Sequence, residues 1–466
     1  MSGAQFGTLF GMDSDARCDY LIRNARVDGS RDGEQLIDIG IAEGKIVAMT
    51  EPGMLSAPEE LDAAGRTVVP GAVDVHVHLG NGPQTVIEDL VTETRMAASG
   101  GVTTICPYII SAGGYDDIMG QLADAVSERS AVDVFPQLGI VSPDQISEVP
   151  RLHREFGVRA FKCFMGYKGA EASPSGIRGI DDASIVVLMS EVAKIPGGRL
   201  AVHAENMEII EAARARVQHD EPDGSLAAWT RARPSLAETE AVQRVLQFAR
   251  ETGCPVTIPH MSVGQDIALL REHAVGVDAV FETCPHFLLF TCESPIGVWG
   301  KANPPLRGAL DQAALWAALK GGALDVLGSD HCPFDAKTKQ ADRTIWEARP
   351  GIPNGSAVIL PMMFDRRAGD PEISAAMITE LTSQNAAARF ALAGKGTIAL
   401  GADADLAIID ATPAVFDSAE LGGVATHSPY DGRTFGHRVW ATIARGDMVF
   451  LEGERRNPTR PARVLT

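Results

Sequence analysis

The chain lacks the features that mark membrane, secreted and nucleic-acid-binding proteins. Its 466 residues contain no run of 18 apolar residues, which argues against a membrane-spanning helix. The opening residues show no basic stretch followed by an apolar core, so we expect no secretory signal. Lysine and arginine number 41 against 61 acidic residues, and the formal net charge of −20 argues against nucleic acid or anionic lipid as a partner.

Cysteine pairs with metal or redox spacing are also missing. The seven cysteines are dispersed without a C-x-x-C motif, which predicts reduced thiols and a cytoplasmic protein. We expect them to serve as small buried apolar side chains. No G-x-G-x-x-G follows an early strand-like run, and this absence argues against a doubly wound sheet, the main alternative to the fold predicted below.

The two ends of the chain share an alternating, strand-like pattern. Residues 1–67 and 395–466 contain short alternating apolar pieces separated by glycine- and aspartate-containing turns. This predicts one small β domain built from both ends. The basic, proline-containing tail "GERRNPTRPARVLT" is expected to form a surface or subunit-contacting arm, with a solvated tail as the alternative.

The middle of the chain, residues 68–394, alternates short apolar runs with longer segments of helical periodicity. Eight such units can be counted, which is the number that a (β/α)₈ TIM-type barrel of the α/β class requires. In this fold, catalytic groups come from the C-terminal ends of several different strands.

Six polar residues stand where the apolar runs give way to loops. Imidazole and carboxylate are ligands that Zn²⁺ accepts, and two histidines spaced H-x-H on a strand project to the same face. We therefore predict that the six converge on one mouth of the barrel as a two-metal hydrolytic site, although each histidine taken singly is also explained as a hydrogen-bonded core residue. The six are His76 and His78 after the first run, Lys162 after the fourth, His203 after the fifth, His260 after the sixth and Asp330 after the eighth.

Lys162 is the unusual member of this set. An ammonium has no lone pair for a metal, and with an ordinary pKa of about 10.4 it would repel two cations. The neutral amine, however, can react with carbon dioxide to give a carbamate whose two oxygens bridge two metals. An ordinary lysine paired with an acid at the barrel rim is the alternative.

The four histidines then supply two nitrogens to each metal, and Asp330 adds an oxygen. Two such cations lower the pKa of a bound water from about 15.7 to about 7 and so provide a bridging hydroxide at neutral pH. Asp330 is also placed to take the proton of that nucleophile and hand it to the leaving nitrogen.

Three further residues lie in loops where a barrel enzyme contacts its substrate. Tyr167, five residues after Lys162, has a phenol that suits donation to the oxyanion of a tetrahedral intermediate. Asn303 and Asn354 are candidate substrate-binding residues after the seventh and eighth strands, although asparagine beside proline or glycine is also ordinary turn chemistry. His286 and His331 are expected to be structural or to support the ligands.

In their order, these motifs resemble the cyclic-amide branch of the amidohydrolase superfamily: dihydropyrimidinases, hydantoinases, allantoinases and dihydroorotases. The resemblance runs from "DYLIRNARV" to "ATIARGDMVF", nearly the whole chain. It implies a barrel with a small β-sandwich, a binuclear zinc centre bridged by carboxylated Lys162, and ring opening of a cyclic amide by a homotetramer. It also implies the six metal ligands named above, with Tyr167 acting on the oxyanion and the loops of Asn303 and Asn354 binding the amide edge through main chain.

The choice among these subgroups rests on fewer residues. Gly80 stands where dihydroorotases carry an arginine that pairs the substrate carboxylate, which counts against dihydroorotate. Asn303 replaces the serine of the "SPPLR" loop, and residues 335–358 follow neither remaining subgroup although they should shape the pocket. We expect hydrolysis of a 5-substituted hydantoin or a dihydropyrimidine, with allantoin as the alternative. Some relatives are non-catalytic scaffolds that have lost metal ligands, whereas this chain retains all six.

Overall fold

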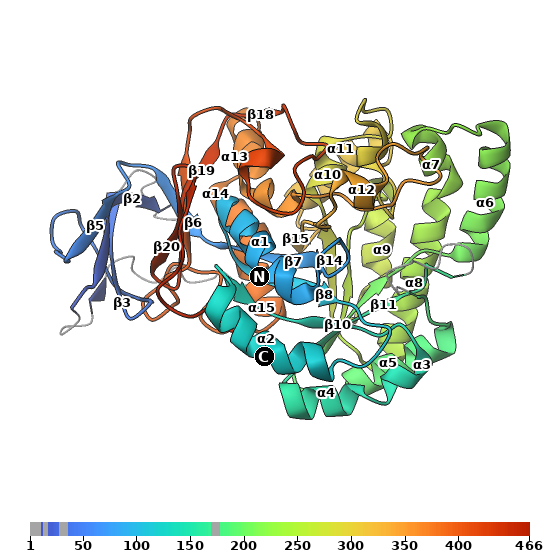
Figure 1. The fold of residues 1–466 in the computed structure, drawn as a ribbon, viewed down its shortest axis with the longest axis horizontal. Helices are drawn as coiled ribbons and strands as arrows, with labels where there is room; N and C mark the ends of the chain where they lie inside the picture. Colours follow the sequence, from blue (N-terminus) through green and yellow to red (C-terminus); the bar gives the residue numbers. More distant parts are fainter. Residues whose placement is uncertain (1–10, 13–16, 28–35, 169–177) are drawn as a thin grey trace.

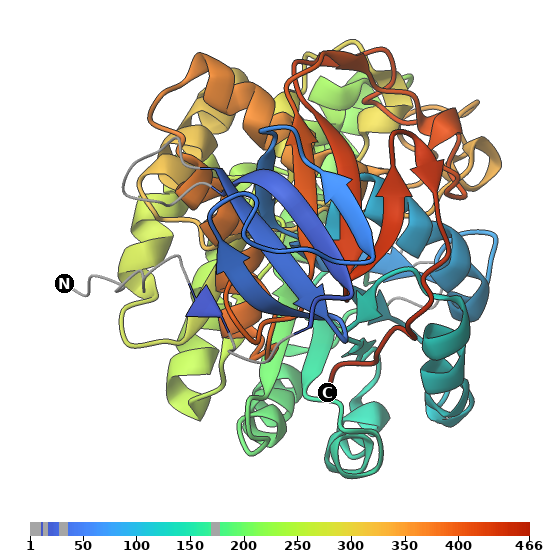
Figure 2. The same cartoon turned by 90° about the vertical axis from the view of Figure 1, so that its left-hand side faces the viewer.

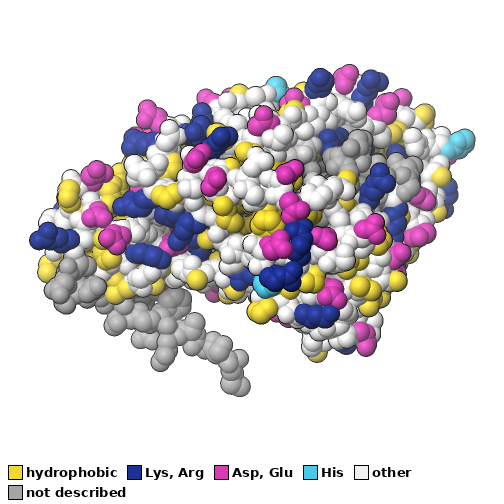
Figure 3. Space-filling view, turned by 60° about the horizontal axis from the view of Figure 1, so that its bottom comes forward, with side chains coloured by type: hydrophobic (Ala, Val, Ile, Leu, Met, Phe, Trp, Pro, Cys, Tyr) yellow, Lys and Arg dark blue, Asp and Glu magenta, His cyan; other side chains and the backbone are white. Residues whose placement is uncertain are grey.

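The structure, a computed structural model, describes residues 11–12, 17–27, 36–168 and 178–466. A parallel barrel with its surrounding helices lies beside a second, mixed sheet (Figure 1). On the face shown in Figure 3, acidic and basic side chains are interspersed. Within the described ranges, no helix is long and apolar enough to cross a membrane.

Eight parallel strands form the nearly closed barrel, and the predicted fold is confirmed. Strand β7 is buried along its whole length, as expected for a parallel strand that is covered on both faces. A parallel bridge between Val77 and His331 closes the ring. The strands are β7 (Ala72–Leu79), β8 (Val102–Ile109), β10 (Gln137–Gly139), β11 (Ala160–Phe164), β12 (Arg199–His203), β13 (Val256–Ile258), β14 (Ala279–Thr283) and β15 (Val326–Leu327), with the short β9 (Asp133–Val134) pairing with β8.

Helices follow the strands and cover the outside of the barrel (Figure 1). The first begins at a capping box, in which the Thr85 side chain and Glu88 satisfy each other's backbone N–H groups. The α-helices are α1 (Val86–Ser99), α2 (Asp116–Arg129), α3 (Pro143–Ile146), α4 (Val149–Phe156), α5 (Asp182–Val192), α6 (Met207–Asp220), α7 (Leu226–Ala232), α8 (Ser235–Thr252), α9 (Ile267–His273), α10 (Pro285–Leu289), α11 (Ala309–Lys320), α12 (Ala336–Lys339), α13 (Ile359–Gly369), α14 (Ala375–Thr379) and α15 (Asn385–Arg389).

The second sheet combines strands from both ends of the chain, as Figure 2 shows in blue and red. The two parts join where β6 pairs antiparallel with β16. The limits of the predicted segments at residues 67/68 and 394/395 stay predictions. The strands are β1 (Gly11–Met12), β2 (Tyr20–Val27), β3 (Leu36–Ala42), β4 (Lys45–Thr50), β5 (Glu59–Asp62), β6 (Thr67–Pro70), β16 (Leu406–Asp410), β19 (Arg438–Ala444), β20 (Asp447–Leu451) and β21 (Glu454–Arg455); β17 (Ala414–Val415) and β18 (Thr434–Phe435) form a separate pair.

The C-terminal tail lies against the barrel. The Val134 N–H donates to the carbonyl of Arg463 at 2.9 Å, and the Leu465 N–H donates to the carbonyl of Val134 at 2.8 Å. The end of the tail is therefore bound to β9 of its own barrel, whereas residues 453–457 are exposed, as the alternative of a solvated tail expects. Six of the seven cysteines are buried as predicted, and Cys292 is partly exposed.

A buried cluster of charges joins the barrel, the second sheet and the tail. The ammonium of Lys395 contacts Asp133 on β9 at 2.6 Å, Asp403 at 3.2 Å, and Asp405. Asp133 also pairs with Arg445 at 3.0 Å and with Arg463 of the tail at 2.7 Å. The carboxylates cluster as a metal site would, but the lysine ammonium stands among them, so the cluster is an ion-pair network.

Replacing the central cation of this network should destabilise the fold. Lys395→Met leaves buried carboxylates without their ammonium, and we expect a loss of about 3–5 kcal/mol in the free energy of unfolding. Urea denaturation followed by circular dichroism measures it. Lys194→Met, at an exposed lysine, is the control. Equal stability of the two variants would contradict the assignment.

Candidate metal centre

One set of predicted ligands gathers around Asp330. The Asp330 Oδ1 atom lies 2.9 Å from His76 Nε2 and 3.1 Å from His78 Nε2, and these two nitrogens are 3.3 Å apart. All three residues are buried and their ligand atoms face one another, as atoms that share one cation would. Asp330 has a φ of +50°, a left-handed conformation that turns its side chain toward the strand ends.

A second set is formed by His203 at the end of β12 and His260 just after β13. His203 Nδ1 lies 2.9 Å from His260 Nε2. Burial lowers the pKa of both imidazoles, and that of His260 falls well below its ordinary value. Both rings are therefore neutral near pH 7 and keep a lone pair for a metal. The ring of His260 is 5.3 Å from that of His76, so the two sets are neighbours.

Lys162 lies with these histidines in the barrel mouth. Its side chain is completely buried, and its Nζ has no hydrogen-bond partner among the described residues. The nitrogen stands 4.6 Å from the centroid of the Tyr108 ring. Burial lowers the pKa of Lys162 to about 8, although Glu282 and Asp330 oppose the shift. The alternative, an ion pair with an acid at the rim, is therefore not seen among the described residues.

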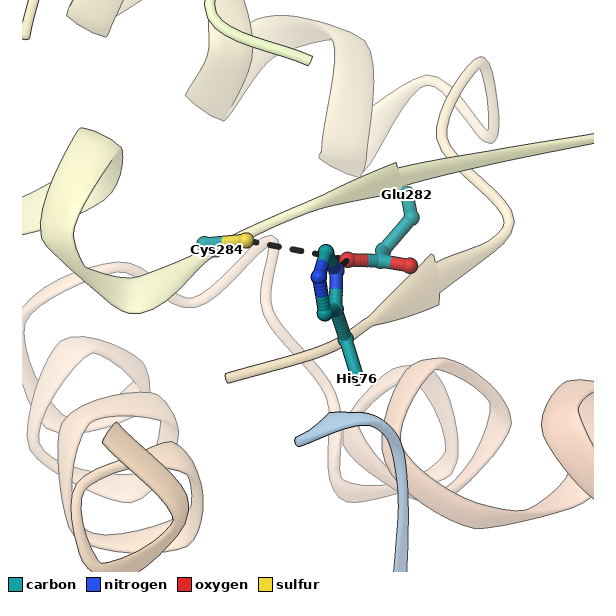
Figure 4. Close-up of side chains that lie close together, drawn as sticks. All are labelled: His76, Glu282 and Cys284. Atoms are coloured by element: carbon teal, nitrogen blue, oxygen red, sulfur yellow. Dashed lines mark hydrogen bonds and ion pairs between the residues drawn. The ribbon is translucent and has the colours of Figure 1, made fainter. Parts of the chain in front are cut away.

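Two buried carboxylates that the sequence analysis did not identify hold ligand histidines. Glu282 on β14 lies 2.7 Å from His76 Nδ1 (Figure 4). It also accepts the backbone N–H of His260 at 3.3 Å. Glu205 lies 3.0 Å from His203 Nε2 and is itself paired with the buried Arg233. A carboxylate on the far ring nitrogen fixes the tautomer of a ligating histidine, so these two residues orient one ligand in each set.

The two carboxylates lie in or directly after apolar runs, where the histidines alone were predicted to be functional. Glu282 stands inside the fully buried strand "AVFET". A carboxylate in such a strand needs a hydrogen-bonding partner, and this requirement was the available signal.

The predicted substrate residues are placed differently from one another. Tyr167 has its ring 5.1 Å from that of His203, and the Asn303 Nδ2 donates to the Tyr167 hydroxyl at 3.5 Å. Burial raises the pKa of Tyr167, so the phenol keeps its proton. Asn354 is completely buried, and its side-chain nitrogen donates to the carbonyl of Ala425. It does not line the cavity, and a substrate contact by its loop stays a prediction.

The remaining two histidines lie behind the mouth. His331 is buried, its Nε2 is 2.8 Å from Glu93, and its carbonyl accepts the N–H of His78. His286 is also buried, and neither ring nitrogen has a partner among the described residues. His331 thus supports the β7 ligands as expected.

A cavity of about 720 Å³ opens over these groups, a size typical of a small-molecule site. His76, His78, Lys162, His203, His260 and Asp330 all line it, together with Tyr167 and Asn303. Although burial lowers the pKa of His76, Glu282 and Asp330 raise it to about 9. The negative potential that holds a proton on His76 so strongly also favours a metal cation. The neutral imidazole nitrogens beside His76 can bind the same cation.

Fold and cavity define a metal-dependent hydrolase built on a (β/α)₈ barrel. Residues 67–449 match the family model described as "Amidohydrolase family". Allantoinases of Rubrobacter xylanophilus and Enterococcus faecalis are 36% and 34% identical, and the alignments cover 93% and 90% of this chain and 95% and 93% of theirs. The chain belongs to the amidohydrolase family.

Solved structures of the same family agree with this membership. The L-hydantoinase (dihydropyrimidinase) of Arthrobacter aurescens matches with a TM-score of 0.87 and 28% identity, over 97% of this chain and 100% of that one. A dihydropyrimidinase of Brevibacillus agri gives a TM-score of 0.82 and 26% identity, over 94% and 96% of the two chains. The predicted branch of cyclic amidases is confirmed.

Removing the carboxylate behind His76 should weaken metal binding. In Glu282→Gln the amide fills the same space but no longer supplies a negative charge to His76 Nδ1, and we expect roughly a 10- to 100-fold loss of metal affinity. Competition with a chelator measures this loss, with the exposed Glu293→Gln as control. An unchanged affinity would remove Glu282 from the centre.

Proposed function

We propose that the protein hydrolyses a ring amide of a cyclic ureide, with 5-substituted hydantoins as its substrates. The observation that carries this proposal is the meeting of both histidine pairs, Asp330 and the unpartnered Lys162 in one cavity. Allantoin is itself a hydantoin with a ureido group at C5. The curated allantoinases and the solved hydantoinases are therefore both named for this five-membered ring, whereas the name dihydropyrimidinase, also carried by solved relatives, refers to the six-membered alternative.

The proposed cofactor is a pair of divalent metals, most suitably zinc. His76, His78 and Asp330 would hold one, and His203 and His260 the other; such ligand sets also accept Mn²⁺, Co²⁺ and Fe²⁺. The lowered pKa of Lys162 favours the neutral amine. Its lone pair can attack the carbon of carbon dioxide, and loss of a proton from the nitrogen then gives a carbamate that would hold both metals. A homotetramer in the cytoplasm is part of the same proposal, from the family resemblance and the free thiols.

When bound, the metals would lower the pKa of water and polarise the attacked carbonyl. The pKa of Asp330 is well below its ordinary value because, although burial raises it, His76 and His78 lower it more. Asp330 is thus an ionised carboxylate that can take the proton of the attacking water and return it to the leaving nitrogen. Tyr167 keeps its proton and can donate to the oxyanion, while Asn303 steadies the phenol.

The conformation of Gly80 argues against a substrate ring that carries a carboxylate, such as dihydroorotate. Gly80 has a φ of +73°, and a Cβ there would stand 2.6 Å from a methyl carbon of Val86. The chain therefore disfavours the arginine that pairs a substrate carboxylate in dihydroorotases.

Assays of the purified, metal-loaded protein on allantoin, hydantoin, 5-substituted hydantoins and dihydrouracil test the function. We expect ring opening, greatest with hydantoins, and loss of both metals and nearly all turnover in Lys162→Ala. Failure to open any ring with two metals bound, or a fully active and metal-loaded Lys162→Ala, would contradict the proposal.

Removing only the phenol hydroxyl separates binding of metal from catalysis. Tyr167→Phe should lower kcat about 10- to 1000-fold because a donor to the oxyanion is lost. Its metal content, measured by elemental analysis, should equal that of the unchanged protein. An unaltered kcat would exclude Tyr167 from the reaction.

A further inference from the structure

One wall of the cavity comes from residues 334–351, most of which belong to the stretch 335–358 that follows neither subgroup. It contributes Phe334, Thr338, Trp346 and Gly351 to the lining. Beside this stretch, residues 301–303 bring Lys301 and Asn303 to the same cavity. The position of the wall relative to these residues sets the space left for a substituent on the bound ring.

A buried lysine connects residues 334–351 with residues 301–303. Lys339, the last residue of α12, is completely buried, and its Nζ donates to the carbonyl of Lys301 at 3.0 Å and to that of Gly351 at 2.6 Å. Among the described residues no carboxylate pairs with it. Enclosing an ammonium with only carbonyl partners is costly, and burial accordingly lowers the pKa of Lys339 to about 7. A hydrophobic residue would fill this volume at a lower free-energy cost of burial. The presence of a lysine is therefore explained by its two hydrogen bonds.

A second lysine reaches in the opposite direction. The Nζ of Lys301 donates to the carbonyls of Ala348 at 2.5 Å and Trp346 at 3.3 Å, and it stands 4.0 Å from the ring of Trp229. The backbone N–H of Gly351 also donates to the carbonyl of Lys301 at 2.9 Å. Lys301 thus fastens its segment to two main-chain carbonyls of the other segment, whereas Lys339 links the carbonyl of Lys301 to that of Gly351 in its own segment.

This double connection acts close to the reacting groups without touching them. Asn303 is two residues from Lys301, and its side chain meets the Tyr167 hydroxyl. Lys339 itself is absent from the cavity lining. A change at Lys339 therefore shifts the wall and the 301–303 segment together, while the metal-site residues belong to other strands.

We propose that Lys339 and Lys301 form a clasp that fixes the cavity wall against the 301–303 segment, and that Lys339 is a positioning residue for selectivity toward the ring substituent. This inference rests on the proposed function for its catalytic readout, but the clasp itself is testable without any substrate.

The first test measures backbone hydrogen exchange of the holoenzyme and of Lys339→Met. The unbranched methionine keeps the side-chain volume but removes the hydrogen bonds to the carbonyls of Lys301 and Gly351. We expect at least a tenfold faster exchange at Arg349 and Gly351, whose N–H groups bond to the carbonyls of Lys339 and Lys301. Lys194→Met, outside the cavity, should exchange as the unchanged protein does. Equal rates in all three proteins would overturn the clasp.

The second test measures kcat and KM of the same proteins for hydantoin and allantoin, which differ by the ureido group. Lys339→Met should retain both metals and raise KM about tenfold for the substituted ring, with a smaller effect on the unsubstituted ring and on kcat. A fall in kcat at unchanged KM, or equal effects on both rings, would overturn the role in selectivity. If neither ring is opened by the unchanged protein, the proposed function fails and so does this role, whereas the exchange result still decides the clasp.

A third variant guards against misfolding. Lys339→Gln retains a donor nitrogen on a shorter side chain and should give intermediate exchange rates and an intermediate KM. If Lys339→Met does not fold, the inference is upheld by Lys339→Gln with faster exchange at Gly351, and overturned by Lys339→Gln with unchanged exchange and KM.

Discussion

A lysine amine enclosed at the barrel mouth, without a hydrogen-bond acceptor among the described residues, constrains the rest of this structure. Lys162 lies in one cavity with the four histidines and beside the ring of Tyr108, and burial lowers its pKa. A bare ammonium in such a place is costly, whereas an anionic carbamate beside two cations is stabilised by them. The histidine pairs and Asp330 lie where those cations would be held. The proposed carbamate would therefore explain both why the amine is buried and why the histidines and Asp330 surround it.

The surrounding fold serves to hold these groups in place. The six candidate ligands lie on, or within three residues after, five strands of the barrel, so their separations depend on the barrel as a whole. Glu282 and Glu205 orient one histidine in each set. Farther out, the ion pairs around Lys395 join the barrel to the second sheet, and the clasp of Lys339 and Lys301 joins two sides of the cavity. Rigidity at each of these levels is needed because a metal site tolerates little displacement of its ligands.

The barrel and the convergence of the six residues could be predicted because they follow from local pattern. Apolar runs alternating with helical segments specify the strands, and the strand ends specify which side of the barrel each polar residue faces. Glu205 with Arg233, and Lys339 with its carbonyl partners, could not be predicted, since their roles depend on contacts between distant segments that no spacing encodes. Asn354 differs from these: its loop motif suggested a substrate-binding residue, whereas its side chain is buried and donates to the carbonyl of Ala425.

The central claim is that Lys162, as a carbamate, bridges two metals between the histidine pairs. A crystal structure of the protein purified with bicarbonate, with anomalous scattering recorded at the metal edge, tests this most directly. The account predicts two peaks roughly 3.5–4 Å apart, as in other two-metal sites, with continuous density from Lys162 Nζ to both. A single peak remote from Lys162, or two peaks joined to an unmodified lysine only through other ligands, would contradict it.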